Sequence, residues 1–194
     1  MQTRYKILVF IACLIPFALL VFDIFTDSLS ANPVEDITHR TGEWALHFLI
    51  VTLSITPLRG ITGWQNIQHV RRMLGLYSFF YAVLHLSIYL LDQSFSFDEI
   101  LTDILKRPYI TIGFSALLMM LPLALTSNRF SMRKLGPRWK RLHSLVYVIA
   151  VAAVLHFLWL VKADTLEPVI YAIVIVLLLA WRALRQRHMN RLNS

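Results

Sequence analysis

Long apolar runs alternate with short polar connections along the whole chain. Lipid satisfies no open backbone polar group, so an apolar run of roughly 20 residues is expected to cross the hydrocarbon layer as a helix. The pattern predicts an all-α fold, a polytopic bundle of six transmembrane helices that forms one domain over residues 1–194. The six apolar runs lie near Ile7–Phe22, Trp44–Leu58, Met73–Leu91, Tyr109–Thr126, Leu142–Val161 and Pro168–Trp181.

The charged residues divide between the two sides of these spans. Of the 19 basic residues, 15 fall before the first span, in every second connection, or after the last span, and all 11 acids fall in the other connections. Because basic residues gather in cytoplasmic loops, this division places both termini in the cytoplasm. An even number of spans is then required.

Composition agrees with a membrane protein. Hydrophobic types make up 57% and charged types 15%, against roughly 25% charged in soluble domains. The net charge of +8 lies in clusters beside apolar runs, which is typical of membrane flanks and argues against a nucleic-acid partner. The single cysteine, Cys13, lies in the first run and is expected to be a core residue. We find no internal repeat.

Two histidines stand at matched depth on the third and fifth spans. His85 lies seven residues before Asp92 and His156 six before Lys162, so each is about 9–10 Å from the same end of its span. Both spans run in the same direction, so the two imidazoles can approach one iron from opposite faces. We therefore predict a haem between His85 and His156. The alternative is that each histidine makes a polar contact between helices.

A third histidine lies near the opposite end of the fifth span. His143 precedes His156 by 13 residues, or about 20 Å along a helix, a spacing suited to a second haem. The matching position on the third span holds Arg72, which is always protonated and cannot bind iron in the ordinary way. Arg72 could instead clamp a haem propionate, a flavin phosphate or a quinone oxygen. This end is thus a second haem site with an unusual ligand or a site for another cofactor.

Three other histidines give weaker indications of a functional role. His47 lies near one end of the second span and could line a cavity, and His39 and His69 are expected in loops. No Asp, Glu, Lys or Arg is expected deep inside a span, which removes the usual machinery of ion transport.

Five stretches resemble the ferric reductase-like transmembrane superfamily and, more closely, the MsrQ (YedZ) family. That family comprises the haem-binding membrane subunits of a bacterial periplasmic methionine sulfoxide reductase system. Together the five stretches cover most of the chain in a matching order. They are NPVEDITHRTG (32–42), RRMLGLYSFFYAVLHL (71–86), RPYITIG (107–113), KLGPRWKRLHSLVYV (134–148) and LHFLWLVKAD (155–164).

The resemblance implies b-type haem, one or two, on His85, His143 and His156. The superfamily often has a second histidine on the third span, which Arg72 or Arg71 replaces here. FMN is also implied, without residues to assign to it. The resemblance further implies the bacterial inner membrane and electrons from the quinone pool. The implied partner is a periplasmic molybdopterin-dependent methionine sulfoxide reductase catalytic subunit.

Three functions follow as hypotheses. The first is an electron-transfer subunit that oxidises quinol and does no methionine chemistry itself. The second is a ferric or flavin reductase-type cytochrome that is fed by a separate cytosolic NAD(P)H flavin reductase. The third is a haem-free transporter or assembly factor.

Overall fold

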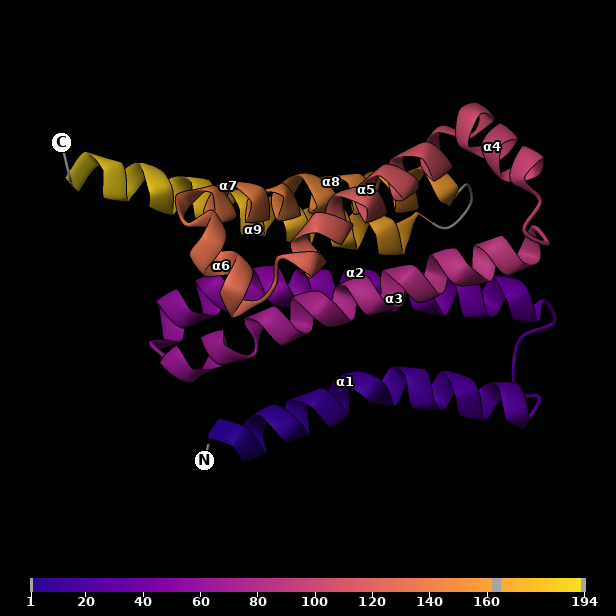
Figure 1. The fold of residues 1–194 in the computed structure, drawn as a ribbon, viewed down its shortest axis with the longest axis horizontal. Coiled ribbons are helices and arrows are strands. Elements are labelled where there is room, and N and C mark those ends of the chain that lie inside the picture. The colour runs from indigo at the N-terminus through magenta and orange to yellow at the C-terminus, as the bar shows by residue number, and fades with distance from the viewer. Residues whose placement is uncertain (1, 162–164, 193–194) are drawn as a thin grey trace.

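The computed structural model describes residues 2–161 and 165–192, and within them every regular element is a helix. Figure 1 shows them in chain order from indigo to yellow. Their bounds are α1 Gln2–Phe25, α2 Pro33–Thr62, η1 Gln65–His69, α3 Arg71–Asp92, α4 Phe97–Lys106, α5 Pro108–Leu125, α6 Arg129–Leu135, α7 Pro137–His143, α8 Leu145–Leu160 and α9 Leu166–Leu192.

Six helical stretches in the described part of the chain are long and apolar enough to cross a membrane, which confirms the predicted six-span bundle. They lie at residues 4–25, 33–62, 71–92, 108–125, 137–160 and 166–187. The short helices α4 and α6 lie in the polar connections at opposite ends of the bundle (Figure 1). We call these ends the α4 end and the α6 end. The start of α1 and the last turns of α9 both lie at the α6 end, as an even number of spans requires.

The second helix begins about ten residues earlier than its apolar run. Asn32 caps it by accepting from the backbone N–H of Glu35, and Pro33 occupies the first turn, where a missing N–H costs nothing. The helix therefore includes His39 and Glu43, which the sequence analysis placed in a loop. Hydropathy misses this start because the first turns are polar and protrude beyond the apolar run.

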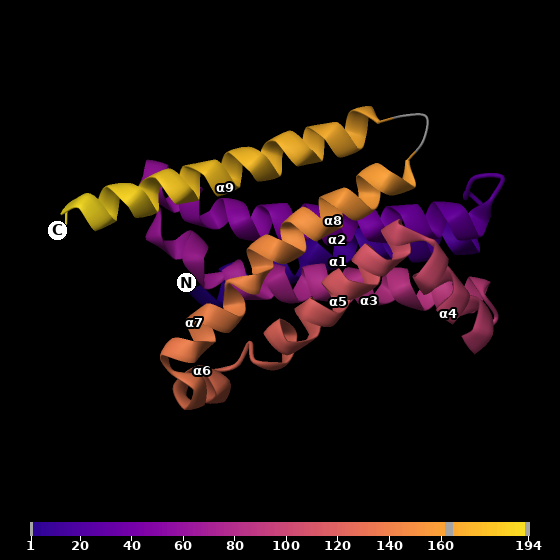
Figure 2. The ribbon, with the colours of Figure 1, turned by 90° about the horizontal axis from the view of Figure 1, so that it is seen from above.

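The spans pack around two buried clusters, and α2 contributes to both. Figure 1 shows α1 on one side of the α2–α3 pair, with α5, α8 and α9 on the other side, and Figure 2 shows α8 between α9 and α5. One buried cluster, which includes Leu49 and Ile149, joins α2 to α5, α8 and α9. A second cluster, built on Phe48, Tyr77 and Tyr81, joins α2 and α3 to α1.

A tyrosine from α3 is inserted into the hydrogen-bond ladder of α1. The hydroxyl of Tyr81 donates to the carbonyl of Cys13 at 2.9 Å and accepts from the N–H of Phe17 at 3.0 Å. These two backbone groups would pair with each other in a regular helix. Pro16 already interrupts the ladder here, so the tyrosine satisfies groups that lipid would leave unpaired. Cys13 is buried, as expected.

Candidate functional site

The rings of His85 and His156 face each other in the half of the bundle nearer the α4 end. Their ring centres lie 6.1 Å apart and their planes are nearly perpendicular, at 84°. His85 comes from α3 and His156 from α8, the two co-directional helices on which the sequence analysis paired them. The expected approach of the two imidazoles is therefore what the fold produces.

Backbone carbonyls fix the tautomer of both rings. The Nδ1 atom of His85 lies 2.8 Å from the carbonyl oxygen of Thr38, and that of His156 lies 2.7 Å from the carbonyl oxygen of Tyr109. A carbonyl oxygen only accepts, so each Nδ1 carries the hydrogen and donates it. Each Nε2 is left with its lone pair, which is the state a metal ligand needs.

Two glycines make room for these rings. A Cβ on Gly42 would lie 3.0 Å from Nδ1 of His85, and a Cβ on Gly113 would lie 2.7 Å from Nδ1 of His156. Real Cβ contacts are essentially never this short at Gly113 and rarely so at Gly42. Alanine at either position would push its imidazole out of place, so α2 and α5 each provide a recess for one ring.

The two half-sites repeat along the chain at an offset of 71 residues. Each glycine lies four residues after the residue whose carbonyl holds the histidine, and each histidine lies 47 residues after that carbonyl. The tetrapeptide Ala-Val-Leu-His occurs at 82–85 and again at 153–156. The sequence analysis found no repeat, and this identity is the signal that would have revealed the two glycines. The α2–α3 and α5–α8 pairs thus hold their histidines in the same way, with one carbonyl and one glycine each.

A polar network links the start of α5, whose Tyr109 carbonyl binds His156, to α3 and α4. Asp103 on α4 accepts from the hydroxyl of Tyr89 at 3.0 Å and pairs with Arg107 at 3.0 Å. Arg107 in turn donates to the hydroxyl of Tyr109 at 3.4 Å. Since the carbonyl of Tyr109 accepts from His156, this network connects α3 and α4 to the histidine pair.

The arrangement suits an iron held from two sides. Two metal–nitrogen bonds of about 2 Å each, together with the half-widths of two rings, span roughly 6 Å. The observed separation of 6.1 Å matches that span. No group of three or more His, Cys, Asp or Glu residues in the described ranges could hold a metal ion. A metal centre at this pair would therefore bring its other ligands with it, as a porphyrin does.

His143 at the α6 end is in a different state. Its ring stacks on Trp139, with centres 3.9 Å apart, and its Nε2 lies 3.0 Å from the hydroxyl oxygen of Thr126. That hydroxyl has one hydrogen, which the carbonyl of Pro122 accepts at 2.6 Å. Nε2 of His143 must then be the donor to Thr126, so it has no lone pair for iron.

The two arginines proposed near His143 differ in position. Arg71 is half-buried and its charge acts on His143, whereas Arg72 is exposed. The arginine near His143 is therefore Arg71, although spacing alone had matched Arg72 to this depth.

Three further histidines, His39, His47 and His69, fall in two places. His39 and His47 lie on α2 toward the α4 end, where His39 contacts Glu43 and His47 contacts Tyr171. His69 ends η1 at the α6 end.

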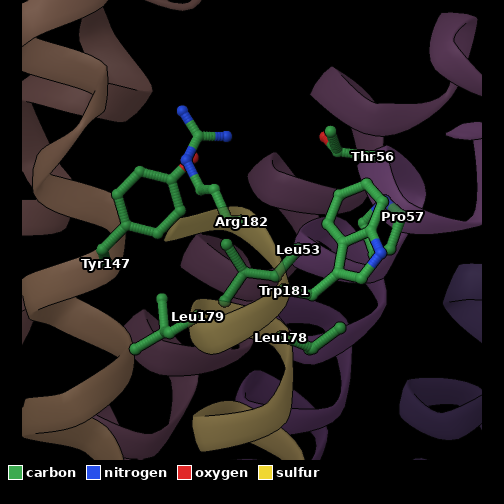
Figure 3. A pocket seen from close by; sticks show the side chains of 8 residues that line it. All are labelled: Leu53, Thr56, Pro57, Tyr147, Leu178, Leu179, Trp181 and Arg182. Atoms are coloured by element: carbon green, nitrogen blue, oxygen red, sulfur yellow. The ribbon is translucent and has the colours of Figure 1, made fainter. Parts of the chain in front are cut away.

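A separate pocket lies among α2, α8 and α9 at the α6 end. Figure 3 shows Thr56, Tyr147, Trp181 and Arg182 around it, with leucines completing the wall. The guanidinium of Arg182 lies over the Tyr147 ring at 4.4 Å. The pocket contains neither His85 nor His156.

Comparison with known proteins identifies the class to which this fold and histidine pair belong. The family model described as the ferric reductase like transmembrane component matches residues 41–154, which include His85 and end two residues before His156. No solved structure matches the chain.

Curated relatives narrow the class further. A "Protein-methionine-sulfoxide reductase heme-binding subunit MsrQ" of Xanthomonas oryzae pv. oryzae (strain MAFF 311018) is 51% identical over 193 residues, which cover 96% of this chain and 88% of the relative. The protein of the same name from Xanthomonas axonopodis pv. citri (strain 306) is 52% identical over 91% of this chain and 84% of its own length. That from Herminiimonas arsenicoxydans is 47% identical over 93% and 84%. The chain belongs to the MsrQ family within the ferric reductase-like transmembrane class.

Proposed function

We propose that this chain is a membrane electron-transfer subunit that holds haem b between His85 and His156. The observation that carries the proposal is the facing pair of rings, 6.1 Å apart, each with its Nε2 free because a carbonyl takes the Nδ1 hydrogen. A haem held by both imidazoles would supply single-electron transfer and would leave no open position for oxygen.

The protein supplies orientation. The carbonyls of Thr38 and Tyr109 hold each ring in one tautomer, and Gly42 and Gly113 let the rings lie close to the backbone of α2 and α5. Such outer hydrogen bonds typically change metal affinity by about 10–100-fold. The chain itself carries out no methionine chemistry in this account.

The partner follows from the relatives. They are named as haem-binding subunits of a protein-methionine-sulfoxide reductase, so we assign this chain an equivalent catalytic partner, of the periplasmic molybdopterin-dependent type. Quinol of the membrane pool is the proposed donor. The proposed location is a bacterial inner membrane, and the division of charge supports cytoplasmic termini. In that orientation the α4 end and the nearby histidine pair would face the periplasm.

Two expectations stay predictions. A second haem on His143 would require that ring to leave both Trp139 and Thr126. FMN, which the family resemblance implies, has no assigned residues in this chain.

The test is the haem content per polypeptide of purified variants, measured as the pyridine haemochrome. His85→Ala and His156→Ala are each expected to lose haem by at least about tenfold, since even a lost outer partner costs that much. His143→Ala serves as the matched control on the same membrane span as His156, and it is expected to keep the low-spin haem of the pair. Full haem content in both His85→Ala and His156→Ala would contradict the ligand assignment, and wild-type protein without haem would favour a haem-free function.

Orientation is tested separately with a fluorescent protein fused after α9. The fusion is expected to fluoresce, because green fluorescent protein folds in the cytoplasm and not after export through the general secretion route. A dark fusion that becomes active with a periplasmic phosphatase reporter would reverse the topology.

A further inference from the structure

A line of titratable side chains runs down one side of α2 from the α4 end. Glu35, His39, Glu43 and His47 follow one another at intervals of four residues, so each is the neighbour of the next on the helix surface. The line covers about 18 Å along the axis, from the exposed first turn to the membrane-embedded part of the span. The sequence placed the first three in a loop and only His47 inside the span, so hydropathy alone did not reveal the line.

The line faces the first turns of α9. His39 Nδ1 lies 3.2 Å from a carboxylate oxygen of Glu43, and the two side chains are 40% and 28% exposed. The charges of Glu43 and Glu167 both act on Tyr171, and that of Glu167 also acts on His39. The hydroxyl of Tyr171 lies 2.9 Å from Nε2 of His47 at the inner end of the line.

Other charged groups near the line are few among the described residues. From α3, His85 lies within electrostatic range of His39. Arg40, on a different side of α2, turns to Asp23 of α1 at 2.6 Å. Glu35, the outermost member, accepts from the Asn32 side chain at 2.9 Å and is exposed to water. The line therefore extends from the half-buried His47 to the aqueous surface.

The inner end of the line has an unfilled hydrogen-bonding position. Nδ1 of His47 is buried and has no partner in the described structure. Whichever of Tyr171 and His47 donates in their shared bond, Nδ1 is left as an unpaired donor or acceptor. Buried polar atoms are nearly always paired, so this atom indicates a bound water or a ligand group. Trp44 packs on the His47 ring at 5.1 Å and is itself 37% exposed on the apolar surface, where a membrane-soluble molecule would approach.

This inner end lies beside the histidine pair. Gly42, which forms the recess for His85, precedes His47 by five residues, or roughly 7 Å along the helix. The Phe157 ring, next to His156 in sequence, contacts both His39 and Tyr171, at 5.6 and 5.9 Å. A reductant bound at His47 would thus have an electron acceptor and a proton path close together.

We propose that His47 and Tyr171 bind the head group of a quinol, and that Glu43, His39 and Glu35 carry its protons to water at the α4 end. The inference rests on the proposed function, which makes quinol the donor. Oxidation of one quinol to quinone breaks two O–H bonds and releases two electrons and two protons. His85 and His156 would hold the haem that accepts these electrons one at a time, and the catalytic partner would be their final acceptor. In this proposal Nε2 of His47 donates to Tyr171, so Nδ1 carries the lone pair, accepts each proton in turn and passes it outward along the line.

The test uses the haem-loaded protein in detergent with decylubiquinol as the probe. Stopped-flow spectra follow haem reduction by decylubiquinol across a pH series, and equilibrium dialysis measures decylubiquinone binding. Dithionite reduces the haem in parallel, because this reaction needs no quinol site. The variants are His47→Ala, the milder His47→Gln, Tyr171→Phe and Glu43→Gln. Thr56→Val is the matched control, because Thr56 Oγ1 is also a buried unpaired atom on α2 but lies in the pocket at the α6 end (Figure 3).

The expected results separate binding from proton transfer. His47→Ala slows reduction by decylubiquinol by about a hundredfold or more, the usual contribution of a general base, and weakens decylubiquinone binding. Glu43→Gln slows the same reaction and flattens its pH profile, while it leaves decylubiquinone binding unchanged. Both keep wild-type haem content and dithionite reduction, and Thr56→Val behaves as wild type.

Three outcomes would overturn the inference. Wild-type rates in both His47 variants and in Glu43→Gln, with wild-type protein reduced by decylubiquinol, would reject the line and leave the quinol donor standing. Loss of haem or of dithionite reduction in the conservative His47→Gln and Glu43→Gln would assign the line a structural role. Failure of decylubiquinol to reduce wild-type protein would instead reject the donor in the proposed function, and this inference with it.

Discussion

The two ends of the fifth span each present a histidine, and the protein treats them in opposite ways. His156 near the α4 end donates its Nδ1 hydrogen to a carbonyl and faces a second imidazole 6.1 Å away. His143 near the α6 end donates from Nε2 to Thr126 and is covered by Trp139. Both residues belong to one membrane span, residues 137–160, so a place on this span does not by itself leave Nε2 of a histidine available.

The comparison shows how the neighbouring helices decide whether Nε2 of a histidine keeps its lone pair. At the α4 end two neighbouring helices each contribute a carbonyl and a glycine, so the ring is fixed while its free nitrogen points away from the backbone. At the α6 end Nε2 of His143 donates to Thr126, so it has no free lone pair.

The largest effect is expected from Gly113→Ala. The new methyl group would lie 2.7 Å from Nδ1 and 2.8 Å from Cε1 of His156, which breaks the bond to Tyr109 or displaces the ring. Haem content is expected to fall by about tenfold or more, as for a lost outer-shell partner. Alanine in a helix is otherwise favoured over glycine by about 1 kcal/mol, so unfolding of α5 would not explain a loss. Haem content is measured as the pyridine haemochrome, with helicity from circular dichroism as the control, and unchanged haem would show that the recess is unimportant.

A smaller loss is expected from Gly42→Ala. Its methyl group would lie 3.0 Å from Nδ1 of His85, a contact that a shift of a few tenths of an ångström can relieve. The matched control is Gly75→Ala on α3, where the nearest atom is 3.7 Å away, an ordinary contact. Haem content in the order Gly75→Ala, Gly42→Ala, Gly113→Ala, from highest to lowest, is the expected series. A reversed order would show that haem retention does not depend on these distances.

Asp103→Asn is expected to affect stability more than haem. The substitution weakens the bonds to Tyr89 and Arg107, and because Arg107 is 55% exposed its ion pair contributes little. Together we expect a loss of about 1 kcal/mol in the free energy of unfolding. Thermal unfolding in detergent measures it, and a full loss of haem would mean that α4 positions His156 more tightly than this network implies.

The smallest effect is expected from Thr126→Val. It removes the partner of His143 Nε2 at the α6 end and touches nothing at the facing pair. The haem spectrum and the haem content per polypeptide should stay as in wild type. An increase in haem content would instead show that the bond to Thr126 keeps His143 from binding a second haem.

Much of the fold could be predicted because a bilayer makes hydropathy a direct signal. Six spans and the pairing of His85 with His156 both follow from apolar run lengths and from depth along parallel helices. Depth, however, says nothing of the direction in which a side chain points around the helix axis. That is why Arg72 was matched to the depth of His143, whereas Arg71 is the arginine that acts on it.

The parts that were missed depend on contacts between distant residues or on polar helix turns. The carbonyls of Thr38 and Tyr109 lie 47 residues before the histidines they hold, so no local sequence pattern predicts these bonds. The polar start of α2 hid His39 and Glu43 from a hydropathy argument, although Asn32 and Pro33 form a readable helix start. The repeat of Ala-Val-Leu-His was present in the sequence and would have pointed to the paired glycines.

The central claim is that two imidazoles hold one iron, and electron paramagnetic resonance of the oxidised wild-type protein tests it most directly. The account predicts a low-spin ferric signal and, because the ring planes stand at 84°, the strongly anisotropic form that perpendicular axial imidazoles produce. A high-spin ferric signal, which reports a haem with one strong axial ligand, would contradict it.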